Sequence, residues 1–351
     1  MRILDEHPST VFSSPADATA PAPPESRGLE RDAVRLLVAG PDGVSHARVR
    51  DLASYLEPGD LVVVNDSATV AGELDAERLG AGPVVLHLAT PLDDGTWVVE
   101  VRTAPSAERA ILDAAPGDRF LAGSVVVDLV APYPRTGSSP TGHGNRLWRA
   151  SVSGPLPDRL AAHGRPIAYG YLPRRYPLSA YQTIFGTRPG SAEMPSAGRP
   201  FTPRVVTDLV ARGVTIAPVT LHTGVSSQEA GEAPQAERYQ VPETTARLVN
   251  TVRAGGGRIV AVGTTVTRAL ESAVEGDRVV ARSGWTDRVV TPLHPPRIVT
   301  GLVTGWHDPQ ASHLLLVEAV AGRELSQRAY DEAVAHGYQW HEFGDTALLL
   351  P

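Results

Sequence analysis

The stretch IVAVGTTVTRALES, residues 259–272, joins a run of small and β-branched apolar residues directly to a helical pattern. The run before Gly263 predicts a buried strand, and the apolar residues from Val266 to Val274 recur at helical spacing. A helix with one apolar face packs against a sheet. The junction therefore predicts a strand-turn-helix unit of an α/β protein.

The same alternation of strand and helix patterns continues on both sides of this unit. Residues 201–213, FTPRVVTDLVARG, offer Thr202 as the N-cap of a helix and Gly213 as its terminator. A strand pattern then ends at His222, and a later one ends at His307. Strands that alternate with helices indicate an α/β main domain.

Two segments lack this alternation. Residues 72–155 hold short β-type runs, broken by Gly, Pro and Asp at the intervals expected for a small barrel or sandwich. Residues 13–28 are rich in Pro, Ala and Ser without periodicity, which predicts a mobile arm. The pattern alone thus predicts an α/β fold with an inserted or appended β domain.

The composition narrows the possible functions. The chain has 351 residues and contains neither cysteine nor lysine, which excludes disulfides, thiolate metal sites and Schiff-base catalysis through lysine. The net charge of −7 disfavours a uniformly basic nucleic-acid binder but is compatible with a local arginine patch. We find neither an apolar run of membrane-spanning length nor the layout of a signal peptide. We therefore expect a soluble cytoplasmic protein without membrane contact.

Polar residues follow several predicted strands at the point where each strand ends. They are Asn65, Asp66, Ser67, His222, Gly263, Thr264, Thr265 and His307. Ligands of α/β proteins bind outside the carboxyl ends of the strands, because loops and helix N-termini converge there. The sequence therefore predicts a ligand site at this edge.

The helix start after Gly263 has two interpretations. Unpaired N–H groups at a helix N-terminus suit a carboxylate or phosphate, and Arg268 in the first turn would bind the same anion. Alternatively, Arg268 pairs with Glu271 at i,i+3 spacing on the solvated face of the helix. The spacing does not choose between them.

Other motifs of catalysis are missing. The chain has no G-x-S-x-G elbow and no H-E-x-x-H sequence, and the glycine-threonine junction lacks the dinucleotide-binding and P-loop forms. His294, His307 and His313 lie among prolines and apolar runs without the spacing of metal ligands. We therefore expect no metal site.

Seven stretches carry a resemblance to a known family. They are RLLV (35–38), PGDLVVVNDS (58–67), YQTIFGTRPGS (181–191), PSAG-x-x-FT (195–202), TLH-x-G (220–224), AVGTT-x-x-R-x-LES (261–272) and FGD (343–345). Over nearly its whole length the chain resembles the S-adenosylmethionine:tRNA ribosyltransferase-isomerase family of queuosine biosynthesis. The combination of AVGTT-x-x-R-x-LES with PSAG-x-x-FT is specific.

The resemblance implies a fold and a reaction. It implies a mixed-sheet or barrel-like α/β domain at residues 1–71 and 156–351, with an inserted small β-barrel domain at 72–155. Family members transfer the ribosyl portion of S-adenosylmethionine to 7-aminomethyl-7-deazaguanine at the tRNA wobble position, isomerise it to an epoxycyclopentane, and release adenine and methionine. The implied co-substrate is S-adenosylmethionine, the implied partner is the tRNA anticodon arm, and no metal is required.

The matched segments supply the candidate site residues. The reaction must remove a proton beside the sulfonium and benefits from a proton donor for adenine. The acid–base candidates are His222, Glu237, His307, Asp66 and Asp345. The candidates for contact with S-adenosylmethionine are Gly263, Thr264, Thr265, Arg268, Ser196, Gly198 and Asn65. We expect the methionine carboxylate to meet the backbone after Gly263 and the Arg268 guanidinium.

The chain departs from the family pattern at polar loop positions. Arg199-Pro200 replaces the Leu-His of the family's PTAGLHFT, and Gln235-Ala236 replaces the His-Ser that precedes Glu237. Because the scaffold glycines and the Gly-Thr-Thr helix start persist, we infer selective change near the nucleobase or acceptor. Two alternatives stay open: an S-adenosylmethionine-using transferase with a non-tRNA acceptor, and a non-catalytic S-adenosylmethionine-binding paralogue.

Overall fold

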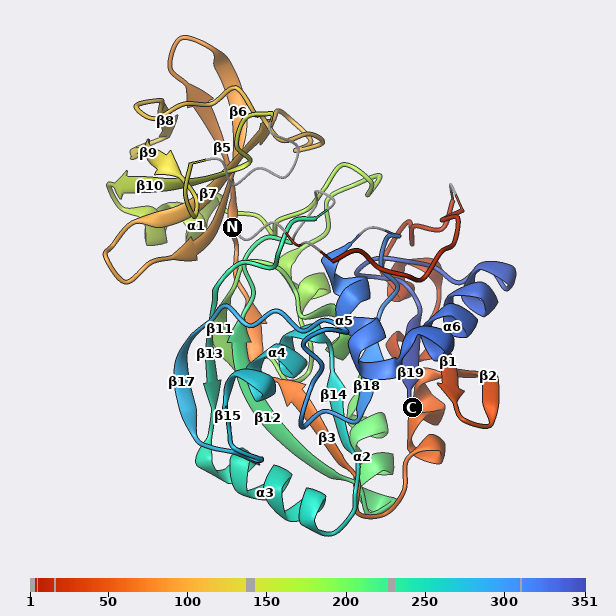
Figure 1. Cartoon of the computed structure of the whole chain (residues 1–351). Helices are drawn as coiled ribbons and strands as arrows, with labels where there is room; N and C mark the ends of the chain where they lie inside the picture. Colours follow the sequence, from red (N-terminus) through yellow and green to blue (C-terminus); the bar gives the residue numbers. More distant parts are fainter. Residues whose placement is uncertain (1–3, 5, 16, 137–142, 227–230, 310) are drawn as a thin grey trace.

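Two different β assemblies make up the computed structural model of the protein (Figure 1). The structure describes residues 4, 6–15, 17–136, 143–226, 231–309 and 311–351. Within these residues, the larger assembly is a nine-stranded mixed sheet and the smaller one is a closed antiparallel barrel of six strands. The predicted α/β class with an inserted small barrel is confirmed. The main sheet is open, however, because it ends at two edge strands instead of closing.

The central strands of the main sheet run parallel, so their carboxyl ends meet at one edge. In spatial order the strands are β17 (Arg282–Thr286), β13 (Glu237–Val241), β12 (Thr215–His222), β3 (Leu61–Asn65), β14 (Ile259–Val262), β18 (Gly301–Thr304), β19 (Thr346–Leu349), β1 (Arg35–Gly40) and β2 (Gly43–Arg48). All residues of β3 and β14 are buried, as expected for parallel strands that are covered on both faces.

Helices cover both faces of this sheet because alternate side chains of each strand point to opposite sides. Val62 and Val64 pack with α2 (Pro203–Ala211) and with the 3-10 helix η3 (Val49–Tyr55). Leu61 and Val63 pack on the opposite face. The helices on that face are α3 (Glu243–Ala254), α4 (Thr264–Ser272), α5 (Ser312–Ala321) and α6 (Arg323–Ala335). No helix among the described residues is long and apolar enough to span a membrane.

Local signals in the sequence explain several of these boundaries. Thr202 caps α2 by accepting a hydrogen bond from the backbone N–H of Val205, as the sequence predicts. The remaining short elements are η1 (Pro24–Arg27), η2 (Arg31–Ala33), β4 (Ser67–Thr69), η4 (Leu178–Tyr181), β11 (Arg188–Ser191), η5 (Ser196–Gly198), β15 (Val274–Glu275) and β16 (Arg278–Val279). The first strand pattern after Gly213 ends at His222, again as predicted.

The barrel projects from the main sheet in Figure 1 and has its own apolar core. Its strands are β10 (Leu147–Ser153), β7 (Trp97–Thr103), β6 (Gly82–Pro91), β5 (Glu73–Arg78), β8 (Arg119–Ala122) and β9 (Val125–Pro132), in spatial order. Helix α1 (Leu156–His163) packs on this core through Leu156. All six strands lie inside the predicted interval 72–155. That this interval is a separate domain stays a prediction.

A buried ion cluster lies where the barrel meets the main domain. His87 is fully buried and lies between two carboxylates, with Nε2 3.1 Å from Glu73 and Nδ1 3.2 Å from Glu100. Burial alone would lower the pKa of His87, but its hydrogen bonds to the two glutamates outweigh burial and raise it. The two carboxylates therefore favour the charged form of the imidazole.

Arginines on both sides complete this cluster. Arg175, which follows the barrel in the sequence, donates to Glu73 at 2.6 Å. Arg146 on the barrel side bridges Glu100 at 3.0 Å and Glu232 of the main domain at 2.6 Å. Each carboxylate thus has cationic partners, which is the condition under which buried charges are tolerated. The cluster fixes the barrel against the main domain.

The N-terminal segment is packed, in contrast to the mobile arm that its composition predicts. Within the described residues 13–15 and 17–28, Ala18 and Ala20 are buried and pair with the backbone of Trp340. The Arg27 guanidinium donates to the carbonyl of Phe343 at 2.9 Å. Small residues and extended prolines allow a close approach to this surface, so the same composition suits a packed strand-like segment.

Candidate active site

A cavity of about 880 Å³ opens at the carboxyl ends of β12, β14 and β18. The loops that follow these strands, at residues 223–226, 263–265 and 304–308, form much of its wall. Segments 169–171, 193–197 and 341–342 form the opposite part, and Arg102 of the barrel reaches the rim. This is the edge at which the sequence predicts a ligand site. The volume lies near the upper end of the range for ligand pockets, about 300–1,000 Å³.

Gly263 makes the turn from β14 into α4. Its φ of 95° is a backbone conformation that other residues rarely adopt, and a Cβ there would lie 3.3 Å from Ala197. The turn places Thr264 and Thr265 on the cavity wall, together with the unpaired N–H groups of the first helical turn. Asn65 lies behind this wall, where its side-chain amide donates to the carbonyl of Leu221 at 2.9 Å.

Arg268 does not lie on a solvated helix face, so the alternative interpretation of a surface arginine is wrong. Only 5% of its surface is exposed, since α4 is covered by the sheet on one side and by the chain after β17 on the other. Its guanidinium pairs with Glu237 and donates to the carbonyls of Gln235 at 2.8 Å and Arg288 at 3.0 Å. All three nitrogen atoms are therefore engaged within the protein.

The alternative pair between Arg268 and Glu271 is not formed either. The Glu271 carboxylate instead accepts backbone N–H groups of Arg297, Ile298 and Val299, at 2.9 to 3.1 Å. It thereby holds the loop before β18. Both side chains of the predicted surface pair are used to fasten the loops that cover α4.

Two stacked imidazoles lie on the wall beside α4. The rings of His307 and His313 are 4.9 Å apart and inclined by only 9°. His307 Nε2 lies 3.0 Å from the hydroxyl of Thr304. Burial lowers the pKa of His307 well below its ordinary value, and burial lowers that of His313 to about 4. Both rings are therefore neutral at neutral pH.

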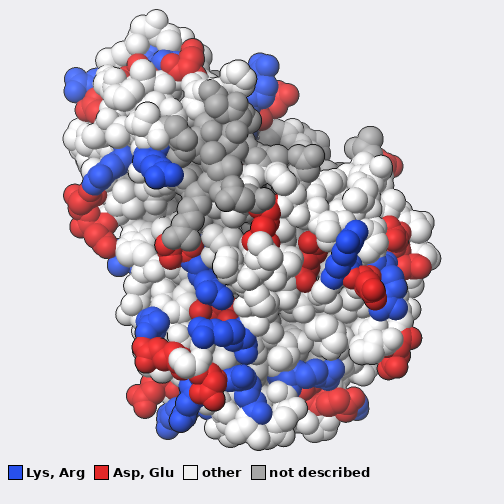
Figure 2. Space-filling model, in the orientation of Figure 1, with Lys and Arg blue, Asp and Glu red and all other residues white. Residues whose placement is uncertain are grey.

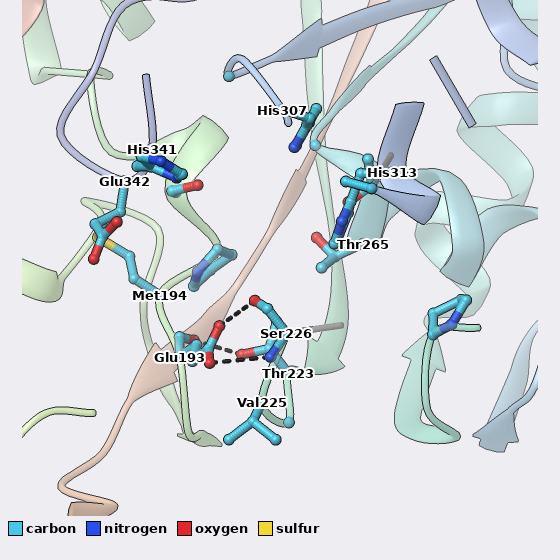
Figure 3. Close-up of a pocket in the computed structure, with 18 of the residues that line it drawn as sticks. Glu193, Met194, Thr223, Val225, Ser226, Thr265, His307, His313, His341 and Glu342 are labelled. Atoms are coloured by element: carbon cyan, nitrogen blue, oxygen red, sulfur yellow. Dashed lines mark hydrogen bonds between the residues drawn. The ribbon is translucent and has the colours of Figure 1, made fainter. Parts of the chain in front are cut away.

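Glu193 lies across the cavity from these histidines (Figure 3). Its carboxyl group accepts hydrogen bonds from the Tyr169 hydroxyl, the Ser226 hydroxyl and, at 3.0 Å, the Ser226 backbone. Burial raises the pKa of Glu193 despite these donors. A carboxyl group with a raised pKa can serve as a proton donor. Glu193 is absent from the sequence prediction because it lies between two matched stretches.

The other predicted residues separate into two groups. The cavity wall contains Ser196, Glu237, Gly263, Thr264, Thr265, Arg268 and His307. The residues outside that wall are Asn65, Asp66, Gly198, His222 and Asp345. A residue that belongs to a family motif therefore does not necessarily line this cavity.

The residues outside the wall have partners within the fold. His222 Nδ1 lies 2.7 Å from the Ser67 hydroxyl, and burial lowers its pKa. Asp66 accepts a hydrogen bond of 2.6 Å from Thr220. Asp345 accepts from the Arg35 backbone at 2.8 Å and pairs with its guanidinium at 2.7 Å. These contacts join neighbouring strands and loops, and the catalytic role of these three residues stays a prediction.

A possible metal-ligand group exists elsewhere on the surface. Among the described residues, His46 of β2, Glu332 of α6 and His336, which directly follows α6, bring their ligand atoms within 4.8 Å of one another. His307 and His313 belong to no such group in that part of the chain. The expectation that the reaction needs no metal stays a prediction.

Comparisons with known proteins identify the family. The model of the family described as "Queuosine biosynthesis protein" matches residues 9–349. The S-adenosylmethionine:tRNA ribosyltransferase-isomerase of Thermus thermophilus is 38% identical, over 93% of this chain and 97% of that protein. The protein of the same name from Acidiphilium cryptum is 36% identical, over 95% of this chain and 98% of that protein.

A solved structure is similar along the same length. The crystal structure of S-adenosylmethionine tRNA ribosyltransferase from Thermotoga maritima has a TM-score of 0.53 and 29% sequence identity. The likeness covers 97% of this chain and 99% of the other. With a family model and relatives that match nearly the whole chain, the chain belongs to the queuosine biosynthesis protein family.

Proposed function

We propose that the protein is an S-adenosylmethionine:tRNA ribosyltransferase-isomerase that forms epoxyqueuosine and releases adenine and methionine. The observation that carries this proposal is the composition of the cavity wall. Segments from three stretches that resemble the family, 195–202, 220–224 and 261–272, meet around one cavity. Its volume of about 880 Å³ is sufficient for S-adenosylmethionine together with part of an acceptor.

The methionine end of S-adenosylmethionine is expected at the start of α4. The free N–H groups after Gly263 and the hydroxyls of Thr264 and Thr265 suit a carboxylate. Arg268 contributes by holding Glu237, whose other oxygen accepts the Gly224 backbone N–H at 2.9 Å. The arginine and its glutamate thereby join two walls of the cavity, which is a positioning role.

Burial of the two histidines suits a cationic substrate. The sulfonium of S-adenosylmethionine carries a positive charge, so protonated imidazoles beside it would oppose binding. His307 and His313 are instead held neutral by burial. A neutral His307 can accept the proton from the 5′ carbon, which the adjacent sulfonium acidifies. Glu193, with its raised pKa, can donate a proton to the departing adenine.

The acceptor in this proposal is the anticodon arm of tRNA, and we expect a cytoplasmic location with that role. Figure 2 shows basic and acidic side chains interspersed over the face in view, without one continuous basic field. That distribution, with the net charge of −7, favours one second candidate: the same transfer to a non-tRNA acceptor. The two candidates share the cavity chemistry and differ only in the acceptor.

One experiment tests both candidates. The protein is incubated with S-adenosylmethionine and either tRNA bearing 7-aminomethyl-7-deazaguanine or the free modified nucleoside, and products are identified by mass spectrometry. Epoxyqueuosine in tRNA, with adenine released, supports the proposed function. Conversion of the nucleoside alone supports the second candidate. Absence of both products overturns the enzyme assignment and leaves a binding protein.

A variant of His307 tests the proposed proton transfer. Replacing His307 by Ala should lower kcat by about 100- to 10,000-fold, the range for loss of a general base. Binding of S-adenosylmethionine, measured by calorimetry, should persist. His294→Ala is the matched control, because His294 is exposed and lies outside the cavity wall. A His307 variant as active as this control would remove His307 from the proton transfer.

A further inference from the structure

The mouth of the cavity carries an aromatic platform that the donor chemistry does not use. Tyr171 stacks on His341 with ring centroids 4.9 Å apart and an inclination of 19°. Tyr169 continues the stack behind Tyr171, at 6.2 Å and 30°. Tyr171 is 38% exposed, an unusual state for a large aromatic side chain with two ring neighbours. Tyr171 is the ring shared by both stacked pairs, and Arg102 lies over the Tyr169 ring, so a further ring would stack beyond His341, which is partly exposed.

The backbone at this place is held in an unfavourable conformation. His341 has a φ of 66°, one of only two positive values at non-glycine residues among the described residues. The adjacent turn is closed by a 3.0 Å hydrogen bond from the Gly344 N–H to the His341 carbonyl. Strained backbone persists where the surrounding structure over-determines it, and it concentrates at ligand sites. The His341 ring that this backbone carries is inclined by 19° to the Tyr171 ring.

Glu342 adds a hydrogen-bond acceptor beside the platform. Its Oε2 accepts the Tyr171 hydroxyl, while Oε1 accepts no hydrogen bond from any side chain or backbone group that the structure describes. Figure 3 shows Glu342 and His341 on the side of the cavity opposite Thr265 and His313. The platform and its carboxylate are therefore separate from the expected methionine end.

We propose that Tyr171, His341 and Glu342 form the subsite for the acceptor base, and this rests on the proposed function. A base taken out of its stack is commonly held by aromatic stacking and by hydrogen bonds to its Watson–Crick edge. A guanine-type edge offers N1–H and a 2-amino group, both donors, which match the carboxylate of Glu342. The 7-aminomethyl group lies on the far side of the bicyclic ring. It therefore points away from Glu342 and into the cavity, toward the donor.

We assign Arg174, which is outside the cavity wall, to the phosphate of a flanking nucleotide. Arg174 follows Tyr171 by three residues, is exposed and lies 4.9 Å from the centroid of the Tyr176 ring. Within the described residues it forms no ion pair, unlike the neighbouring Arg175, which binds Glu73. Stacked guanidinium groups with free donors are well suited to bind phosphate. The subsite therefore combines base stacking, edge recognition and a backbone contact.

The first test separates acceptor binding from donor binding. Steady-state KM for the modified tRNA and calorimetric Kd for S-adenosylmethionine are measured for Tyr171→Ala, Tyr171→Phe and Glu342→Gln. We expect Tyr171→Ala to raise KM for tRNA by about 5- to 100-fold, as for loss of one stacked base, without changing the Kd for S-adenosylmethionine. Tyr171→Phe should raise it less, because the ring is retained. Glu342→Gln should raise the same KM.

The outcomes distinguish this proposal from the proposed function. Wild-type protein that modifies no tRNA overturns the proposed function, and the subsite with it. Active wild-type protein with an unchanged tRNA KM in Tyr171→Ala overturns the subsite alone. Equal loss of tRNA and S-adenosylmethionine binding would mean a structural role for Tyr171, and would also overturn the subsite.

The phosphate contact has its own matched pair of variants. Arg174→Ala should reduce the dependence of tRNA binding on salt by about one phosphate contact. Arg204→Ala is the control, because Arg204 is also exposed but lies on α2 in an i,i+4 pair with Asp208. If tRNA binding depended on salt concentration to the same degree in both variants, Arg174 would not belong to the subsite.

Discussion

Buried histidines in two regions of the protein are held in opposite charge states. In the cluster between barrel and main domain, hydrogen bonds to Glu73 and Glu100 raise the pKa of His87 against the effect of burial. On the cavity wall, burial lowers the pKa of both His307 and His313, which have no carboxylate partner among the described residues. Burial opposes the charged form in both places, so the neighbouring carboxylates decide the result.

The difference in charge state corresponds to a difference in role. A charged imidazole between two carboxylates is fixed by both ring nitrogens and cannot exchange a proton without loss of its partners. A neutral imidazole beside a cavity can accept one from a ligand. The first arrangement fastens the barrel, and the second is available for chemistry.

Removal of a carboxylate from the cluster should have the largest effect. Glu100→Gln leaves Arg102 and Arg146 without their shared partner and removes one of the two carboxylates from His87. Breaking a buried ion pair in this way costs about 3–5 kcal/mol. We therefore expect a loss of this size in the free energy of unfolding, measured by urea denaturation.

A control within the same barrel isolates the effect of burial. Asp128 pairs with Arg119 at 2.6 Å, but the two side chains are 31% and 56% exposed. Because exposed pairs contribute about 0–1 kcal/mol, Asp128→Asn should change stability little. Equal losses in Glu100→Gln and Asp128→Asn would contradict the view that the buried cluster fastens the barrel.

Arg268 provides the second prediction. Replacing it by Ala leaves the Glu237 carboxylate without its cation at the cavity wall, so we expect a loss of about 3 kcal/mol in the free energy of unfolding, the lower end of the range for buried pairs. Arg204→Ala, on an exposed helix face, serves as the control in the same melts. If the Arg268 variant kept its stability but bound S-adenosylmethionine more weakly, the prediction would be wrong. Arg268 would then contact the ligand directly.

Helix α4 and its Arg268 show which features of the fold could be predicted from the sequence and which could not. The strand-turn-helix unit was predictable because its signals are local: apolar periodicity, Gly263 and the following threonines. The burial of Arg268 was not predictable, because the chain that covers it, around Arg288, has no periodicity and returns from elsewhere in the fold. Local patterns specify which face of a helix meets the sheet, but they do not specify what covers the other face.

The same reason explains which site residues the sequence missed. The pKa of Glu193 is raised by burial, against the effect of its hydrogen-bond donors Tyr169 and Ser226, and the chain segments that bury it come from separate loops. His313 lies in an apolar helical run and carries no motif of its own. Its role becomes visible only when its ring is found parallel to that of His307. Long-range packing therefore determined the chemistry of these side chains.

The last and smallest effect is the dependence of stability on pH, which should differ between the two regions. His87 has a folded-state pKa above the ordinary value of 6.5, so its contribution is complete below that pH and is lost as pH rises through the folded pKa. His313 has a folded-state pKa of about 4, so its contribution is present above pH 6.5 and is lost as pH falls from 6.5 toward 4.

Urea denaturation of the wild type and of His313→Gln between pH 5 and pH 8 measures the second of these effects. Between pH 6.5 and pH 5 the unfolded chain binds a proton at His313 and the native chain does not. The wild type should therefore lose at most about 1.4 kcal/mol per pH unit more than the variant. Above pH 6.5 the difference between the two proteins should be constant. Parallel curves throughout would mean that His313 has the same pKa in the folded and the unfolded protein, and burial in the cavity wall would then not hold its ring neutral.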